Sequence, residues 1–188
     1  MTPHVRVLLL LWGAFLAIWF VSSFGAKKNM PSARAWTGLA IRVVLLVALL
    51  IAFRSPGFVE FARRSAVESG GALGTVGVAL CAAGIGFAIW ARFHLGRNWG
   101  MPMSVKQDAE LVTTGPYKHV RHPIYTGILL ALVGSALVLG AWYAGVVAIF
   151  AVYFFFSARS EETVLLEQFG EPYREYMRRT KMLIPFVL

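Results

Sequence analysis

The stretch GPYKHVRHPIYTGILLALVGSALVLGAWYAGVVAIFAVYFFFS (115–157) places a polar, aromatic segment directly against a long apolar run. The apolar part, about 124–157, has Gly140 near its middle. It is too long for one membrane span, because about 20 residues cross the hydrocarbon core. We therefore predict two shortish helices joined as a tight hairpin. Pro123 suits the first position of the first helix, where its missing N–H is not needed.

Three further apolar segments precede this hairpin, at about 7–24, 36–53 and 71–93. Each is close to the length of a membrane-spanning helix. The first competes with a signal peptide, but no small-residue cleavage site follows it, so we predict a helix of the mature chain. Arg42, inside the second, is expected to snorkel to the nearer surface. The third is rich in glycine, which favours close packing in the middle of a bundle.

The composition agrees with a chain that lives in a bilayer. Of its 188 residues, 58% are hydrophobic and 14% are charged, whereas soluble domains have about 25% charged residues. We predict an all-α integral membrane protein with about five transmembrane helices. It forms a single membrane domain, in which 1–70 holds the first two helices and 71–188 the remainder. The lone Cys81 offers neither an internal disulfide nor a cysteine cluster for a metal.

The distribution of basic residues predicts the orientation. The net charge is +9, but the basic residues lie in short clusters between apolar runs, as membrane anchors do, and not in a nucleic-acid footprint. They concentrate in the loops 25–35 and 92–122 and in the tail from residue 159. We therefore expect both loops and the tail to be cytoplasmic, with the N-terminus outside. The expected location is a bacterial or archaeal inner membrane.

The charged tail, 160–181, is expected to be a cytosolic helical segment. Ser160 before Glu161 and Glu162 is typical of a helix N-terminus with acidic residues in its first turn. Gly170 and Pro172 interrupt the segment, which predicts two short helices in place of one.

The predicted hairpin brings the start of its first helix near the end of its second. Cationic groups for a carboxylate and acidic groups for an ammonium would then share one pocket, which suits a zwitterion. The groups expected to meet are Arg121, His122, Tyr125, Arg159, Glu161 and Glu162. Anchoring at the membrane edge is an alternative interpretation of the same basic and aromatic residues. A zinc site is not predicted, because His119 and His122 lack a third ligand placed with them.

Three motifs in this half of the chain resemble one known family. They are LGRNW (95–99), LVTTGPYKHVRHPIYTG (111–127) and EETVLLEQFGEPYREYMRRTKMLIP (161–185), in this order with the apolar hairpin between the last two. Together they resemble the isoprenylcysteine carboxyl methyltransferase family, and phospholipid methyltransferases share a looser version of the pattern. The resemblance covers about half the chain, from Leu95 to Pro185. The first two helices carry no motif of it.

The resemblance implies an integral membrane enzyme that uses S-adenosylmethionine in a cytosolic pocket and methylates the carboxylate of a lipophilic, isoprenylcysteine-like substrate. That substrate would enter from the bilayer between helices. The residues implied to contact adenosine are Val112, Gly115, Pro116 and Tyr117. Those implied at the amino-acid end of the cofactor are Arg121, His122, Tyr125, Glu161 and Glu162. Glu162 would hold the ammonium or orient the reacting group, and Arg159 would bind the substrate carboxylate.

Other functions stay open on the sequence. The methyl acceptor could be a phospholipid amine, a small thiol or another isoprenoid, and for an amine or thiol Glu161 or Glu162 would take the proton. Sterol reductases share a hairpin of this kind and bind a nicotinamide nucleotide. A non-enzymatic membrane scaffold is the remaining alternative. The oligomeric state is open, because the glycine-rich helix can pack within the chain or against a copy of itself.

Overall fold

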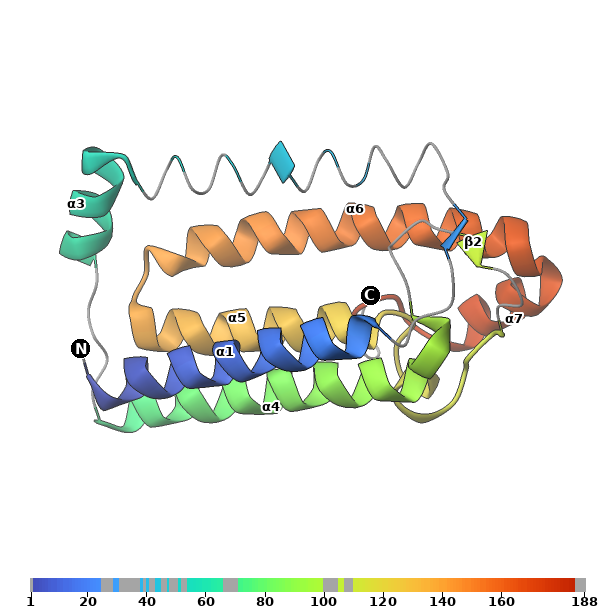
Figure 1. The fold of residues 1–188 in the computed structure, drawn as a ribbon, viewed down its shortest axis with the longest axis horizontal. Helices are drawn as coiled ribbons and strands as arrows, with labels where there is room; N and C mark the ends of the chain where they lie inside the picture. The colour runs from blue at the N-terminus through green and yellow to red at the C-terminus, as the bar shows by residue number, and fades with distance from the viewer. Residues whose placement is uncertain are drawn as a thin grey trace.

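The computed structural model describes residues 2–24, 29–30, 54–65, 71–99, 105–106 and 110–184, with scattered positions between 38 and 51. Its helices are α1 (Pro3–Ser23), α3 (Pro56–Ser65), α4 (Gly71–Leu95), α5 (Pro123–Leu139), α6 (Tyr143–Phe169) and α7 (Glu171–Arg179). Short 3-10 turns, η1 (Gly96–Asn98) and η2 (Gly115–Lys118), lie between α4 and α5. A two-residue antiparallel pair joins β1 (Asn29–Met30) to β2 (Val105–Lys106). The long helices lie side by side along one axis (Figure 1).

Among the described residues, three helices are long and apolar enough to cross a membrane, namely α1, α4 and α6. The predicted hairpin is confirmed. Helix α5 has 17 residues and begins at Pro123, and the chain reverses direction at Gly140 before α6 begins. Gly140 has φ 95°, in the left-handed region that favours glycine. The predicted second span, 36–53 with Arg42, falls mostly outside the described residues.

The glycine-rich helix α4 packs against α5 at two points of very close backbone approach. A Cβ on Gly84 would lie 2.5 Å from the Gly127 carbonyl oxygen. A Cβ on Gly134 would likewise lie 2.6 Å from the carbonyl oxygen of Gly77. Between these crossings, Cys81 is fully buried and packs in the core. The expectation that small residues bring this helix close to its neighbours is confirmed.

The last helix of the hairpin is longer than expected. Ser160 does not begin a new helix, because α6 runs without interruption from Tyr143 to Phe169. No glycine or proline breaks this span after Gly145, so backbone hydrogen bonding continues past the polar residues. The break that we expected in the tail occurs at Gly170, which has φ 61° and separates α6 from α7. Glu161 and Glu162 therefore belong to the same rigid helix as the apolar span.

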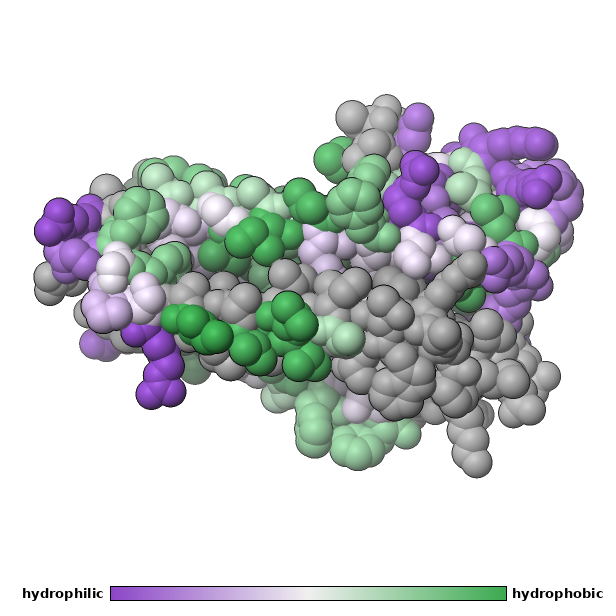
Figure 2. Space-filling model, turned by 90° about the horizontal axis from the view of Figure 1, so that it is seen from above, coloured by the Kyte–Doolittle hydropathy of each residue, from purple (hydrophilic) through white to green (hydrophobic). Residues whose placement is uncertain are grey.

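The surface is that of an integral membrane protein. Hydrophobic side chains form the middle of the visible face in Figure 2, and hydrophilic side chains gather at its two ends. Large apolar side chains are exposed on α1 and α6, including Leu10, Phe20 and Val152. At one end, the Phe58 ring of α3 lies 6.0 Å from the ring of Trp142, which precedes α6. At the other end lie η2, the start of α5 and α7 (Figure 1).

Candidate active site

A cavity of about 590 Å³ lies at the η2–α7 end of the bundle, with its wall formed by α1, the end of α4, η1, η2, α5, α6 and α7. Its size is that of a small-molecule or cofactor site. The lining has a polar part and an apolar part. The polar part includes Tyr117, Arg121, His122, Tyr125, Glu161 and Tyr173. The apolar part includes Phe15, Leu16, Trp19, Ile128 and Phe154.

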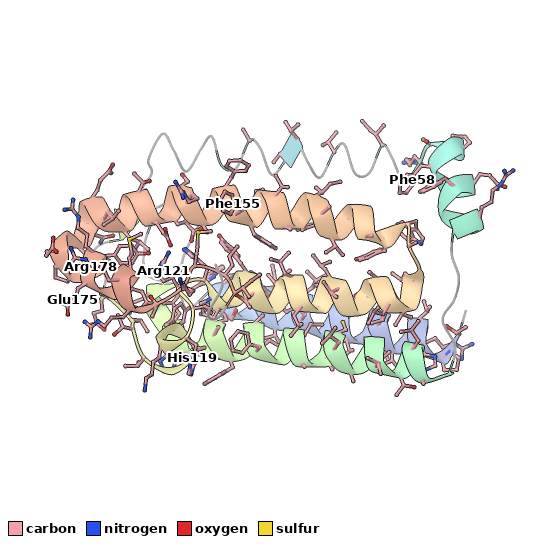
Figure 3. The ribbon with its side chains drawn as sticks, turned by 180° about the vertical axis from the view of Figure 1, so that it is seen from behind. Phe58, His119, Arg121, Phe155, Glu175 and Arg178 are labelled. Carbon is pink, nitrogen blue, oxygen red and sulfur yellow. The ribbon has the colours of Figure 1, made fainter. Side chains whose placement is uncertain are left out.

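A buried ion pair stands at the centre of the polar part. The Nε of Arg121 lies 2.6 Å from the Oε1 of Glu162, and the two side chains are 10% and 8% exposed. The guanidinium also donates to the Met177 carbonyl oxygen at 3.3 Å and to that of Thr180. Figure 3 shows Arg121 at the same end of the bundle as α7. One side chain thus links the start of α5 to α6 and to the chain around the end of α7.

The chain after α7 is also fastened to the start of α5 by backbone bonds. The amides of Arg121 and His122 donate to the carbonyl oxygens of Lys181 and Met182, at 2.8 and 3.1 Å. The Thr126 hydroxyl donates to the Leu183 carbonyl oxygen at 2.6 Å. These contacts hold α7 over the cavity.

His122 lies between the two glutamates. Its Nδ1 is 3.5 Å from Glu161 Oε2, and its Nε2 is 3.5 Å from Glu162 Oε1. Its ring stacks on that of Tyr125, with centroids 5.6 Å apart. Burial by itself lowers the pKa of His122, but the carboxylates of Glu161 and Glu162 beside its ring outweigh this effect, so the pKa is raised above its ordinary value. A protonated His122 gives the cluster groups of both signs.

This raised pKa predicts a pH-dependent stability. A histidine whose pKa is higher in the folded state stabilises fully below its unfolded pKa of about 6.5, and this contribution is lost as pH rises through the folded pKa. We expect wild type to be more thermally stable than His122→Gln. This margin should be larger below about pH 6 than above the folded-state pKa of His122. Thermal unfolding of both proteins in detergent across this range measures the difference. A difference that does not change with pH would contradict a protonated His122.

The two acidic residues have different environments. Glu161 lines the cavity, accepts a hydrogen bond from the Tyr125 hydroxyl and lies 3.5 Å from the hydroxyl of Ser157, which donates to it. Glu162 is outside the lining and faces Arg121. Of the acidic pair, Glu161 is therefore the carboxylate that a bound molecule would meet.

The turn before α5 shapes the opposite wall. Gly115 has φ 58°, and a Cβ there would lie 2.6–2.8 Å from the ring of His94. Pro116 is buried in this turn, outside the lining, whereas Val112 and Tyr117 line the cavity. The Tyr117 carbonyl oxygen accepts a bond of 2.6 Å from the Tyr176 hydroxyl. Gly115 and Pro116 thus position Tyr117.

Arg159 is not brought to this cluster. It is exposed on α6, and its Cζ lies 6.0 Å from the centroid of the Phe155 ring. Neither residue belongs to the cavity lining. His119 is likewise exposed, while His122 is buried.

The sequence analysis missed Tyr173 as a site residue. This tyrosine is 1% exposed, lines the cavity, and has no hydrogen-bond partner for its hydroxyl within the described part of the chain. Burial and then the charge of Glu162 raise its pKa well above the ordinary value, so the hydroxyl keeps its proton. An unpaired buried hydroxyl costs about 1–3 kcal/mol, so an acceptor on a bound molecule fits there. The FGxxYxxY pattern was the available signal.

Comparison with known proteins finds that this region is similar to one family. Residues 77–167 match the model of the isoprenylcysteine carboxyl methyltransferase (ICMT) family. A protein-S-isoprenylcysteine O-methyltransferase of Schizosaccharomyces pombe is 34% identical over 101 residues, covering 52% of this chain and 43% of that protein. Methanethiol S-methyltransferase 1 of Bradyrhizobium diazoefficiens is 41% identical over 70 residues, covering 37% and 24%.

The fold has a solved counterpart. The structure of the eukaryotic intramembrane Ras methyltransferase ICMT matches with a TM-score of 0.58, covering 96% of this chain and 68% of that one, at 18% identity. The chain spans less than half the length of the curated relatives it matches. The matched segment, 77–167, contains most of α4, all of η2 and α5, and most of α6, which carry the polar part of the lining apart from Tyr173. On this match, residues 77–167, slightly less than half of the chain, are similar to the isoprenylcysteine carboxyl methyltransferase family.

Proposed function

We propose that the protein is an integral membrane methyltransferase that uses S-adenosylmethionine and methylates the carboxylate of a lipophilic, isoprenylcysteine-like acceptor. The observation that carries this proposal is the single cavity lining that joins a polar cluster of both signs to an apolar part. The polar part suits a zwitterionic amino acid, and the apolar part suits a hydrocarbon. The match of residues 77–167 to the family supports methyl transfer. The polar part would face the cytoplasm.

The residues of the polar part fit the cofactor. Protonated His122 and the unpaired Tyr173 hydroxyl are donors for a carboxylate, and Glu161 is an acceptor for an ammonium. Val112 and Tyr117 would flank the adenosine. Arg121, with Glu162, holds this wall in place.

The proposed reaction requires little proton transfer by the protein. When bound, the cofactor supplies a methyl group activated by a sulfonium. A carboxylate acceptor is already ionised at neutral pH, since its pKa is near 4. The protein would therefore act by aligning the acceptor and by excluding water. Phe154 and Ile128 form a dry wall beside the polar groups, and a low dielectric favours a reaction in which opposite charges neutralise each other. Arg159 takes no part in this proposal because it lies outside the lining.

A thiol acceptor is a second candidate, and the similarity to methanethiol S-methyltransferase 1 favours it. A thiol must lose its proton, and Glu161 would accept it at the cavity wall. Methyl-labelled cofactor incubated with either N-acetyl-S-farnesylcysteine or methanethiol separates the two candidates. Label transferred to methanethiol alone would replace the carboxylate acceptor.

Binding of S-adenosylhomocysteine tests the cofactor. We expect the purified protein in detergent to bind it with micromolar affinity, and Glu161→Gln to weaken binding at least about tenfold, since a charge-assisted hydrogen bond is lost. Isothermal titration calorimetry measures both. The matched control is Glu171→Gln, the same change at a carboxylate of α7 with a 65% exposed side chain, which should bind as wild type does.

The contradicting results are equally clear. If a folded wild-type protein binds no S-adenosylhomocysteine, the cofactor proposal fails, and a nicotinamide nucleotide is the next ligand to titrate. Binding that Glu161→Gln leaves unchanged would place the amino-acid end elsewhere.

A further inference from the structure

The cavity extends to a helix outside the family match. That match begins at residue 77, yet α1 contributes Phe15, Leu16 and Trp19 to the lining. Phe15 is 6% exposed, whereas Leu16 is 62% exposed. The cavity therefore reaches the outer surface of α1, in the apolar part of the molecule. The side of the cavity formed by α1 therefore lies outside the segment that matches the family.

The rings of Phe15, Trp19 and Trp99 form a continuous surface, which we call the aromatic wall. The Phe15 and Trp19 centroids are 5.0 Å apart, and those of Trp19 and Trp99 are 5.6 Å apart at 87°. All three residues line the cavity. The Phe15–Trp19 contact is tilted at 34° and the Trp19–Trp99 contact is edge-to-face, and both geometries are favourable for aromatic pairs.

Arg92 of α4 holds this wall in position. It is 3% exposed, and its Cζ lies 4.3 Å from the centroid of the Trp99 ring. Its two terminal nitrogens donate to the Gly96 carbonyl oxygen, at 3.0 Å, and to that of Ser22 near the end of α1. This buried guanidinium stacks on the Trp99 indole and links it to the end of α1, the helix that carries Trp19.

We propose that the aromatic wall binds the hydrocarbon part of the methyl acceptor, and that Arg92 is a positioning residue for it. This inference rests on the proposed function and assigns acceptor selection to α1. The acceptor's reacting group would lie at the polar part of the cavity, and its apolar chain would run along the rings to Leu16. A longer chain covers more of these rings, so the wall favours isoprenoid-sized acceptors over one-carbon thiols. The other source of such a chain is a bilayer lipid.

Acceptor length tests the wall. Methyl transfer is measured for N-acetylcysteines carrying 5-, 10- and 15-carbon isoprenyl groups. For Trp19→Ala we expect KM for the longest acceptor to rise about tenfold, the size of effect that loss of one buried ring supports. KM for the shortest acceptor and the Kd of S-adenosylhomocysteine should not change. Arg92→Gln should show the same split between acceptors, with kcat retained.

The matched control is Phe20→Ala, on the same helix but 67% exposed and outside the lining. It should leave all three KM values unchanged. An equal rise for every acceptor, or weaker binding of S-adenosylhomocysteine, would mean a general structural role and would overturn the proposal. Unchanged KM values for Trp19→Ala would overturn it too, and would assign the wall to a bilayer lipid.

A photoaffinity experiment tests the wall without methyl transfer. A diazirine-bearing S-farnesylcysteine should label the tryptic peptide 7–27, which contains most of α1, and excess N-acetyl-S-farnesylcysteine should compete. Labelling of other helices alone would overturn the proposal, whether or not the protein transfers methyl groups. Competed labelling of 7–27 without transfer would support the wall and contradict the proposed reaction.

Discussion

Replacing Arg121 by alanine is expected to lower the free energy of unfolding by about 3–5 kcal/mol, the cost of leaving one partner of a buried ion pair unpaired. The Glu162 carboxylate, 8% exposed, would lose its partner at 2.6 Å. The carbonyl oxygens of Met177 and Thr180 would lose their donor as well. Loss of these bonds should loosen α7 first. Thermal and denaturant-induced unfolding in detergent measures the change.

The control is Arg178→Ala on the outer side of the same region (Figure 3). Its side chain is 73% exposed and lies 3.8 Å from Glu171, and an exposed pair contributes about 0–1 kcal/mol. The double variant Arg121→Met, Glu162→Leu should recover much of the lost stability, because replacing both charges leaves none buried and unpaired. If Arg121→Ala is no more harmful than Arg178→Ala, the ion pair does not hold this end together.

The second large effect is expected at the crossing of α4 and α5. In Gly84→Ala, the new Cβ would lie 2.5 Å from the Ala131 nitrogen and 2.5 Å from the Gly127 carbonyl oxygen. Both are backbone atoms, which cannot rotate away, so the helices must separate. Overpacking of this kind costs about 1–3 kcal/mol, or more where the backbone has to shift. We expect a lower melting temperature in detergent and weaker binding of S-adenosylhomocysteine, since both helices line the cavity proposed to bind it.

Gly86→Ala provides the matched control for this crossing. It lies two residues away on the same helix, and a Cβ there meets nothing within 4 Å. Alanine also favours helix over glycine by up to about 1 kcal/mol. The control should therefore be neutral or stabilising. Equal melting temperatures for the two variants would show that α4 and α5 do not approach each other this closely.

The location of the site was predictable because it depends on connectivity. A helical hairpin must return its end to the neighbourhood of its start, so Arg121, His122 and Tyr125 meet Glu161 and Glu162. The rotation of α6 about its axis was not predictable. Arg159, Glu161 and Glu162 follow one another closely, but 100° per residue turns them in different directions. Packing against α5 decides that Glu161 lines the cavity, Glu162 meets Arg121, and Arg159 is exposed.

The sequence by itself determined the membrane class, the hairpin at Gly140, the role of glycine in α4 and the polar residues that gather near α5. These depend on local composition, on segment length and on chain connectivity, which the sequence records directly. Only the tertiary structure decided that Tyr173 closes the polar part and that α1 supplies Phe15, Leu16 and Trp19. These residues are far apart in the chain, and their meeting depends on how helices rotate and pack. The packing of the helices minimises voids and buried unpaired polar groups over the whole bundle, so it cannot be deduced from any single segment.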